Sequence, residues 1–200
     1  MRRIVILVFV MLVLASACAH GGSNAGHKIA IHVMSHESRT CSKSFPTITS
    51  CEDIVTTYAD SGDIDVFPVF YELTEVTGME YGLEWPTAWG TCAFTTCTGD
   101  FAIGGITNPG DGLSLTWTSC QEVSVVIVGF GWISATGGGM VRIVDSDATS
   151  GIGVVDCAFR ADAPEDTVHA GIGGEEGDDP CDQPVPTDYS SWGKIKGMFR

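Results

Sequence analysis

Short runs with a side-chain period of two dominate this sequence and restrict its fold more than any other feature. Residues 28–34 alternate, with Ile29, Ile31 and Val33 on one face and Ala30, His32 and Met34 on the other. Residues 79–85 alternate between large apolar residues and Glu or Gly, which predicts a half-buried strand. Residues 65–73 and 123–133 are apolar on both faces, which predicts central strands that are covered on both sides. A helical period is rare, so the chain is expected to be all-β.

The remaining strand candidates are separated by turn residues at short intervals. They are residues 92–96, 101–106, 113–120, 139–144 and 153–159. Between two of them, residues 107–112 contain Pro109 and Gly110, a pairing that favours a tight turn. Regular short strands of this kind predict one antiparallel sandwich or barrel, with a β-sandwich assigned to residues 28–160.

The N-terminus has the three parts of a secretory signal peptide, assigned to residues 1–19. Arg2 and Arg3 precede an apolar run over residues 4–14, and small residues follow. That run is shorter than the roughly 20 residues that cross a bilayer. Two outcomes stay open: release after cleavage, or lipid anchoring through Cys18. Both place the protein outside the cytoplasm, secreted or at the cell surface.

Export to an oxidising compartment makes the cysteines candidates for disulfides. Seven lie beyond the signal peptide: Cys41, Cys51, Cys92, Cys97, Cys120, Cys157 and Cys181. Proximity in sequence suggests the pairs Cys41–Cys51 and Cys92–Cys97, whereas the pairing of the other three is undetermined and one thiol is left over. A zinc site is disfavoured because no ligand spacing typical of zinc occurs.

Charge excludes two classes of partner. The 200 residues contain 10 Lys and Arg against 25 Asp and Glu, a net charge of -15. Such a chain repels phosphate backbones and anionic headgroups, so we expect no nucleic acid and no membrane contact except through a lipid on Cys18.

Four strand segments together resemble a known type of domain. Residues 66–73, 80–85, 113–120 and 154–157 look like the strand order of cohesin-type and related carbohydrate-binding-like sandwiches of secreted bacterial proteins. The resemblance covers residues 28–160 and includes no diagnostic motif. It implies a jelly-roll or cohesin-like β-sandwich that acts as a non-catalytic module, and it transfers no dockerin-binding residue.

The C-terminal 40 residues differ from the sandwich in composition. Residues 161–187 are rich in acids, Gly and Pro, which predicts a loop and linker. Residues 188–200 are basic and aromatic, and a short helix is expected there. This tail would fold back onto the acidic body or dock a partner, with Trp192, Lys194, Lys196 and Phe199 as the candidate docking residues.

A search for catalytic motifs finds none that fixes a reaction. The sequence has no nucleophile elbow, zinc-protease helix, phosphate loop or dinucleotide fingerprint. The sequence therefore favours a binding, adhesion or structural protein with an unknown glycan or protein ligand. Two alternatives remain: a glycan hydrolase that uses Glu72, Glu80 or Glu84, and a subunit of an extracellular filament assembled through the tail.

Two further kinds of site have candidate residues. Carboxylates in turns suggest a calcium site, and calcium is the only cofactor that the sequence suggests. The candidate ligands are Asp60, Asp63, Asp65, Asp145 and Asp147. Trp89 and Trp132 follow turn residues and are candidate platforms for stacking on sugars. His32 and His36, four residues apart, are read mainly as exposed histidines near a strand end, with a metal pair as the alternative.

Overall fold

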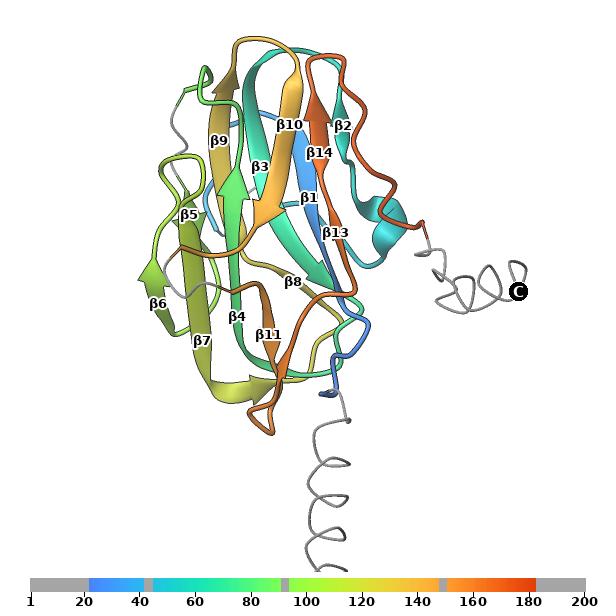
Figure 1. Ribbon diagram of the computed structural model, residues 1–200, viewed down its shortest axis with the longest axis vertical. Helices are drawn as coiled ribbons and strands as arrows, with labels where there is room; N and C mark the ends of the chain where they lie inside the picture. The colour runs from blue at the N-terminus through green and yellow to red at the C-terminus, as the bar shows by residue number, and fades with distance from the viewer. Residues whose placement is uncertain (1–21, 42–44, 91–93, 148–150, 183–200) are drawn as a thin grey trace, which may run out of the picture.

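The structure is a computed structural model, and it describes residues 22–41, 45–90, 94–147 and 151–182 (Figure 1). These residues form two β-sheets stacked face to face, so the predicted β-sandwich is confirmed. One 3-10 turn, η1 (Cys51–Asp53), occurs in the described part of the chain. No helix in that part is both long and apolar enough to cross a membrane.

The first sheet has six strands, in the order β13-β1-β3-β9-β5 with β8 also paired to β3. Their bounds are β1 (Lys28–Ser35), β3 (Gly62–Tyr71), β5 (Thr95–Thr96), β8 (Val125–Ile127), β9 (Gly129–Ala135) and β13 (Asp166–Val168). The β1–β3 pairing runs antiparallel over the whole of β1, from Lys28 opposite Tyr71 to Ser35 opposite Ile64. The two longest strands of this sheet, β1 and β3, correspond to the predicted alternating run 28–34 and to the run 65–73 that is apolar on both faces.

The second sheet has eight strands, in the order β12-β11-β4-β10-β14-β2, with β7 paired to β4 and β6 paired to β7. Their bounds are β2 (Thr57–Tyr58), β4 (Val76–Glu84), β6 (Phe101–Gly104), β7 (Gly112–Gln121), β10 (Gly139–Val144), β11 (Gly153–Val155), β12 (Ala161–Asp162) and β14 (Ala170–Ile172). Both sheets are mixed rather than antiparallel, because β1 pairs parallel with β13 and β14 pairs parallel with β2.

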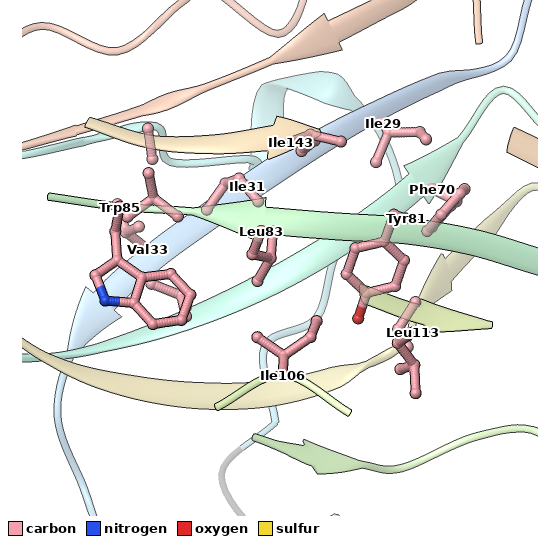
Figure 2. Close-up of a cluster of buried hydrophobic side chains, with 14 of the residues drawn as sticks. Ile29, Ile31, Val33, Phe70, Tyr81, Leu83, Trp85, Ile106, Leu113 and Ile143 are labelled. Atoms are coloured by element: carbon pink, nitrogen blue, oxygen red, sulfur yellow. The ribbon is translucent and has the colours of Figure 1, made fainter. Parts of the chain in front are cut away.

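The main core fills the space between the two sheets (Figure 2). Ile29 and Ile31 of β1 meet Tyr81 and Leu83 of β4, and all four are fully buried. Each buried aliphatic or aromatic side chain of this size contributes roughly 1.5–3 kcal/mol. The alternating residues of β1 and β4 thus supply the interface that joins the sheets.

A second apolar cluster covers the outer face of the six-stranded sheet. Phe67, Val69 and Tyr71 of β3 point to this side and pack with Ile48 and Ile54 from the segment around η1. The strand is thereby covered on both faces, as its apolar run predicted. Residues 123–133 differ from the prediction of one strand, because they divide into β8 and β9, which pair with successive parts of β3.

The predicted loop over residues 161–187 is wrong in its first part. β12, β13 and β14 all lie there, and every residue of β14 is buried. These short strands are rich in acidic residues and glycine, so they have no apolar pattern of their own. They form because of pairing with distant strands: β13 pairs with β1, more than 130 residues away in sequence. The sandwich therefore reaches residue 172 rather than 160, whereas the predicted helix in residues 188–200 lies outside the described residues.

Candidate ligand-binding face

The outer face of the eight-stranded sheet carries the most exposed apolar strand in the described chain. β6 pairs with β7, placing Phe101 opposite Thr116 and Ile103 opposite Ser114. All four β6 residues are exposed, and the side chains of Phe101 and Ile103 are 62% and 52% exposed. The sequence predicted a strand over residues 101–106 but not the exposure of its two large apolar residues.

The register across β7 and β4 shows which side chains share this surface. Leu115 and Met79 are a cross-strand pair buried in the core, at 1% and 2% exposure. Strand side chains alternate in direction, so the flanking pairs point outward. Those outward pairs are Thr116 with Gly78 and Ser114 with Glu80. We call the surface made by Phe101, Ile103, Ser114, Thr116, Gly78 and Glu80 the β6–β7 face.

Next to the exposed side chains of β6, the β6–β7 face is shallowly hollowed. Gly78 and the two hydroxyl residues add little bulk above the backbone, and a depression of about 360 Å³ is lined there by β4, β7 and β11. Ile152 and Val155 border it on the far side. Exposed large apolar side chains next to small polar ones give a surface that a partner can cover without displacing bulky groups.

Asp100 fixes the start of β6 against β7. Its carboxylate accepts hydrogen bonds from the backbone and the hydroxyl of Thr118, both at 2.7 Å. Those hydrogen bonds lower the pKa of Asp100, so it stays ionised at neutral pH. The apolar edge of the face therefore has a fixed negative charge at one end.

Of the carboxylates proposed for glycan hydrolysis, one is in an ion pair and the other two are spaced along a single strand. Glu72, in a left-handed conformation with a φ of 59°, lies 3.5 Å from the ammonium of Lys28 in the turn before β4. Glu80 and Glu84 lie on β4 itself, four residues apart. Four residues of strand span about 13 Å, beyond the roughly 5–9.5 Å between the two carboxyls of glycosidases.

Disulfide bonding is confirmed, but both of the suggested pairs are wrong. The bonds are Cys41–Cys97, Cys51–Cys181 and Cys120–Cys157. Each joins segments that are neighbours in the fold and distant in sequence, by 37 to 130 residues. Cys92 and Cys18 lie outside the described residues.

The calcium candidates are scattered. Asp60, Asp63 and Asp145 are exposed, Asp147 accepts a hydrogen bond from Gly112, and Asp65 is buried against Arg39. In the described chain, two groups have three potential metal ligands in reach of one another, and both consist of a disulfide and one Glu. Neither group includes a calcium candidate, and a sulfur in a disulfide is not a thiolate ligand.

The two tryptophans proposed as sugar platforms have different environments. Trp89 is 7% exposed and belongs to the main core, so it offers no exposed ring. Trp132 is half-buried on the outer face of the six-stranded sheet, where its ring lies 5.5 Å from that of His36. The docking candidates Trp192, Lys194, Lys196 and Phe199 lie outside the described residues.

Two histidines, His32 in β1 and His36 just after it, are hydrogen-bonded to other residues of the chain. His32 is 5% exposed and accepts a 2.9 Å hydrogen bond from the Val55 amide. Burial first, and then the positive charge of Arg39, lowers the pKa of His32 to about 4. His36 is bonded through Nδ1 to Asp65 at 2.7 Å. The reading of both as ordinary exposed histidines is therefore wrong for His32.

Comparisons with known proteins give a resemblance of fold. No protein-family model matches the sequence, and no curated protein does. A non-cellulosomal cohesin from the archaeon Archaeoglobus fulgidus has a TM-score of 0.49 at 10% identity, covering 74% of this chain and 90% of that one. A type II cohesin domain from Acetivibrio cellulolyticus has a TM-score of 0.48 at 10% identity, covering 74% and 95%.

A type I cohesin from Pseudobacteroides cellulosolvens is similar at a lower score. Its TM-score is 0.44 at 10% identity, covering 82% of this chain and 99% of that one. The weak cohesin-like resemblance expected from the strand segments is thus confirmed, and it concerns the fold.

Proposed function

We propose that this chain is a non-catalytic, extracytoplasmic binding protein whose ligand covers the β6–β7 face. The observation that carries the proposal is the pair of exposed apolar side chains, Phe101 and Ile103, side by side on an edge strand. An edge strand without charge or proline is one that soluble proteins normally protect. A ligand that covers β6 in the bound state would explain why this strand is exposed in the free protein.

Three disulfides support a location outside the cytoplasm, since such bonds form and persist in oxidising compartments. The signal peptide expected in residues 1–19 supplies a route of export. Whether Cys18 is removed or lipidated decides between a released and an anchored form, and intact mass after export distinguishes the two.

The separated carboxylates favour binding over hydrolysis. Glu72 is engaged by Lys28, and the backbone positions of Glu80 and Glu84 are about 13 Å apart along β4, wider than the roughly 5–9.5 Å between the two carboxyls of glycosidases. Glu80 nevertheless lies on the β6–β7 face, where a carboxylate accepts hydrogen bonds from a ligand's hydroxyl or amide groups.

The test is a binding screen of the exported, disulfide-bonded chain on a glycan array and a panel of purified extracellular proteins. Each hit is then measured by surface plasmon resonance against the double variant Phe101→Ser/Ile103→Ser. We expect at least about ten-fold weaker binding, because central apolar anchors each contribute more than about 1 kcal/mol.

Phe159→Ser is the matched control, because Phe159 is 82% exposed on the turn after β11 and lies off the face. It should leave affinity unchanged. Equal affinity in the double variant and the parent chain, or cleavage of a glycan on the array, would contradict the proposal.

A further inference from the structure

The position of the last described residues bears on what could cover the β6–β7 face. Cys181 is bonded to Cys51, and the hydroxyl of Tyr71 donates a 2.8 Å hydrogen bond to the carbonyl of Pro180. Both contacts hold the end of the described chain on the outer side of the six-stranded sheet. In Figure 1 the last described residues lie at the right of the molecule, and β6 lies at the left.

Eighteen residues follow Asp182, and their chemistry complements the face. Trp192, Ile195 and Phe199 would supply apolar side chains for the exposed pair Phe101 and Ile103. Lys194, Lys196 and Arg200 supply three of the ten basic residues of the whole chain.

Positive charge is scarce in the body of the protein. Its described basic residues are Lys28, Arg39, Arg142 and Arg160, and three of these four are in ion pairs with acids. The described residues also contain 24 of the 25 acids of the chain. Glu80 on the face and Asp100 at the end of its apolar edge are acids without a basic neighbour in a salt bridge among the described residues. A basic, aromatic segment is therefore the complementary ligand that this chain itself contains.

We propose that residues 188–200 of one copy bind the β6–β7 face of a second copy. The proposal rests on the proposed function, because it names the ligand of the same surface. The tail leaves from the outer side of one sheet, and the face lies on the outer side of the other. This geometry favours a head-to-tail contact between copies, which repeats along a chain of molecules when the rotation does not close.

The first experiment measures the mass of the exported chain by sedimentation velocity at about 20 mM and about 0.5 M NaCl. We expect species of twice the monomer mass and above at low salt, decreasing at high salt because charge attraction is screened. A chain truncated after Thr187 should be monomeric at both salts, and so should Phe101→Ser/Ile103→Ser. Phe159→Ser should assemble like the parent.

Mixing gives a sharper test. The truncated chain keeps the face and lacks the tail, whereas the Phe101→Ser/Ile103→Ser chain keeps the tail and lacks the apolar edge. Each should be monomeric alone, and together they should form a one-to-one dimer and nothing larger. Circular dichroism and a count of disulfides verify that both are folded.

Two results would overturn the inference. One is a parent chain that is monomeric at every salt, including the case in which the tail covers the face of its own molecule. The other is a mixture that remains monomeric. If the serine variant also loses a ligand found in the screen while mass is unaffected by the tail, the proposed function stands and this inference fails.

Discussion

Asp65 is a fully buried carboxylate whose partners come from the segment after β1. It is bonded to the guanidinium of Arg39, to His36 at 2.7 Å and to the backbone amide of Glu37 at 3.1 Å. Arg39 also donates to the carbonyl of Ser35 at 3.0 Å. This network explains why an acid occupies a central strand: it ties the turn after β1 onto β3.

Removing the cation alone should be costly at this position. Arg39→Met leaves Asp65 buried without its charge partner, and we expect a loss of about 3–5 kcal/mol in the free energy of unfolding. Asp65→Asn combined with Arg39→Met should lose less than the single change, because no buried charge remains. Urea denaturation of the parent and the two variants measures this, and a double variant less stable than Arg39→Met would contradict it.

His32 predicts a pH dependence of stability with a definite sign. Its pKa is lowered to about 4 in the folded state, mainly by burial, so between that pH and the unfolded value near 6.5 only the unfolded chain takes up the proton. The free energy of unfolding should therefore fall as pH falls through this window, by up to about 3 kcal/mol from His32.

The His32→Asn variant isolates that contribution. Its side-chain oxygen can accept the Val55 amide hydrogen bond that His32 accepts now, and it does not titrate. His27 and His169 also have lowered pKa values through burial and stay in both proteins. In denaturant titrations from pH 7 to pH 4, the parent should lose up to about 3 kcal/mol more free energy of unfolding than His32→Asn, and parallel curves would contradict the assignment.

At the scale of elements, the local pattern of apolar residues predicts the long strands. It does not predict the short strands that form only by pairing with segments far along the chain. β1 and β4 are readable because their alternation is strong. β13 and β14 are short and acidic or glycine-rich, and their strand character comes from neighbours far along the chain. Trp89 looked exposed because it follows a proline turn, yet its ring folds back into the core. A strand was also predicted at β6, but its position at the edge of the sheet, which exposes Phe101, is a property of the whole sheet.

The disulfide pairing, like the pairing of the short strands, is not determined by the sequence alone. A peptide map of the non-reduced protein should yield peptides that join Cys41 to Cys97, Cys51 to Cys181 and Cys120 to Cys157. Mass spectrometry identifies them directly. A peptide with a Cys41–Cys51 bond would contradict the fold, because it would free the segment that covers the outer face of β3.

The Cys51–Cys181 bond should matter most for stability. It spans 130 residues, against 37 for Cys120–Cys157. Loop entropy alone makes the longer crosslink worth about 1 kcal/mol more. Thermal denaturation should therefore show a larger loss for Cys51→Ser/Cys181→Ser than for Cys120→Ser/Cys157→Ser, and the reverse order would argue against a clamp on the covering segment.

At the scale of the whole molecule, charge sets how the protein behaves in solution. The net charge is -15, and most of the acids among the described residues face water without a basic partner there. Self-repulsion of this kind opposes the compact state and is screened by salt. Raising NaCl from about 20 mM to about 0.5 M should therefore raise the melting temperature of the monomeric truncated chain. A melting temperature that falls with salt would indicate that attractive ion pairs dominate instead.

The claim on which this account depends is that ligands bind through the β6–β7 face. Hydrogen–deuterium exchange of the exported chain, with and without the strongest glycan or protein hit from the binding screen, tests it most directly. We expect the ligand to slow exchange in β6 and β7 and to leave the turn around Phe159 unchanged. Unchanged exchange in β6 and β7, with protection elsewhere on the sandwich, would contradict it.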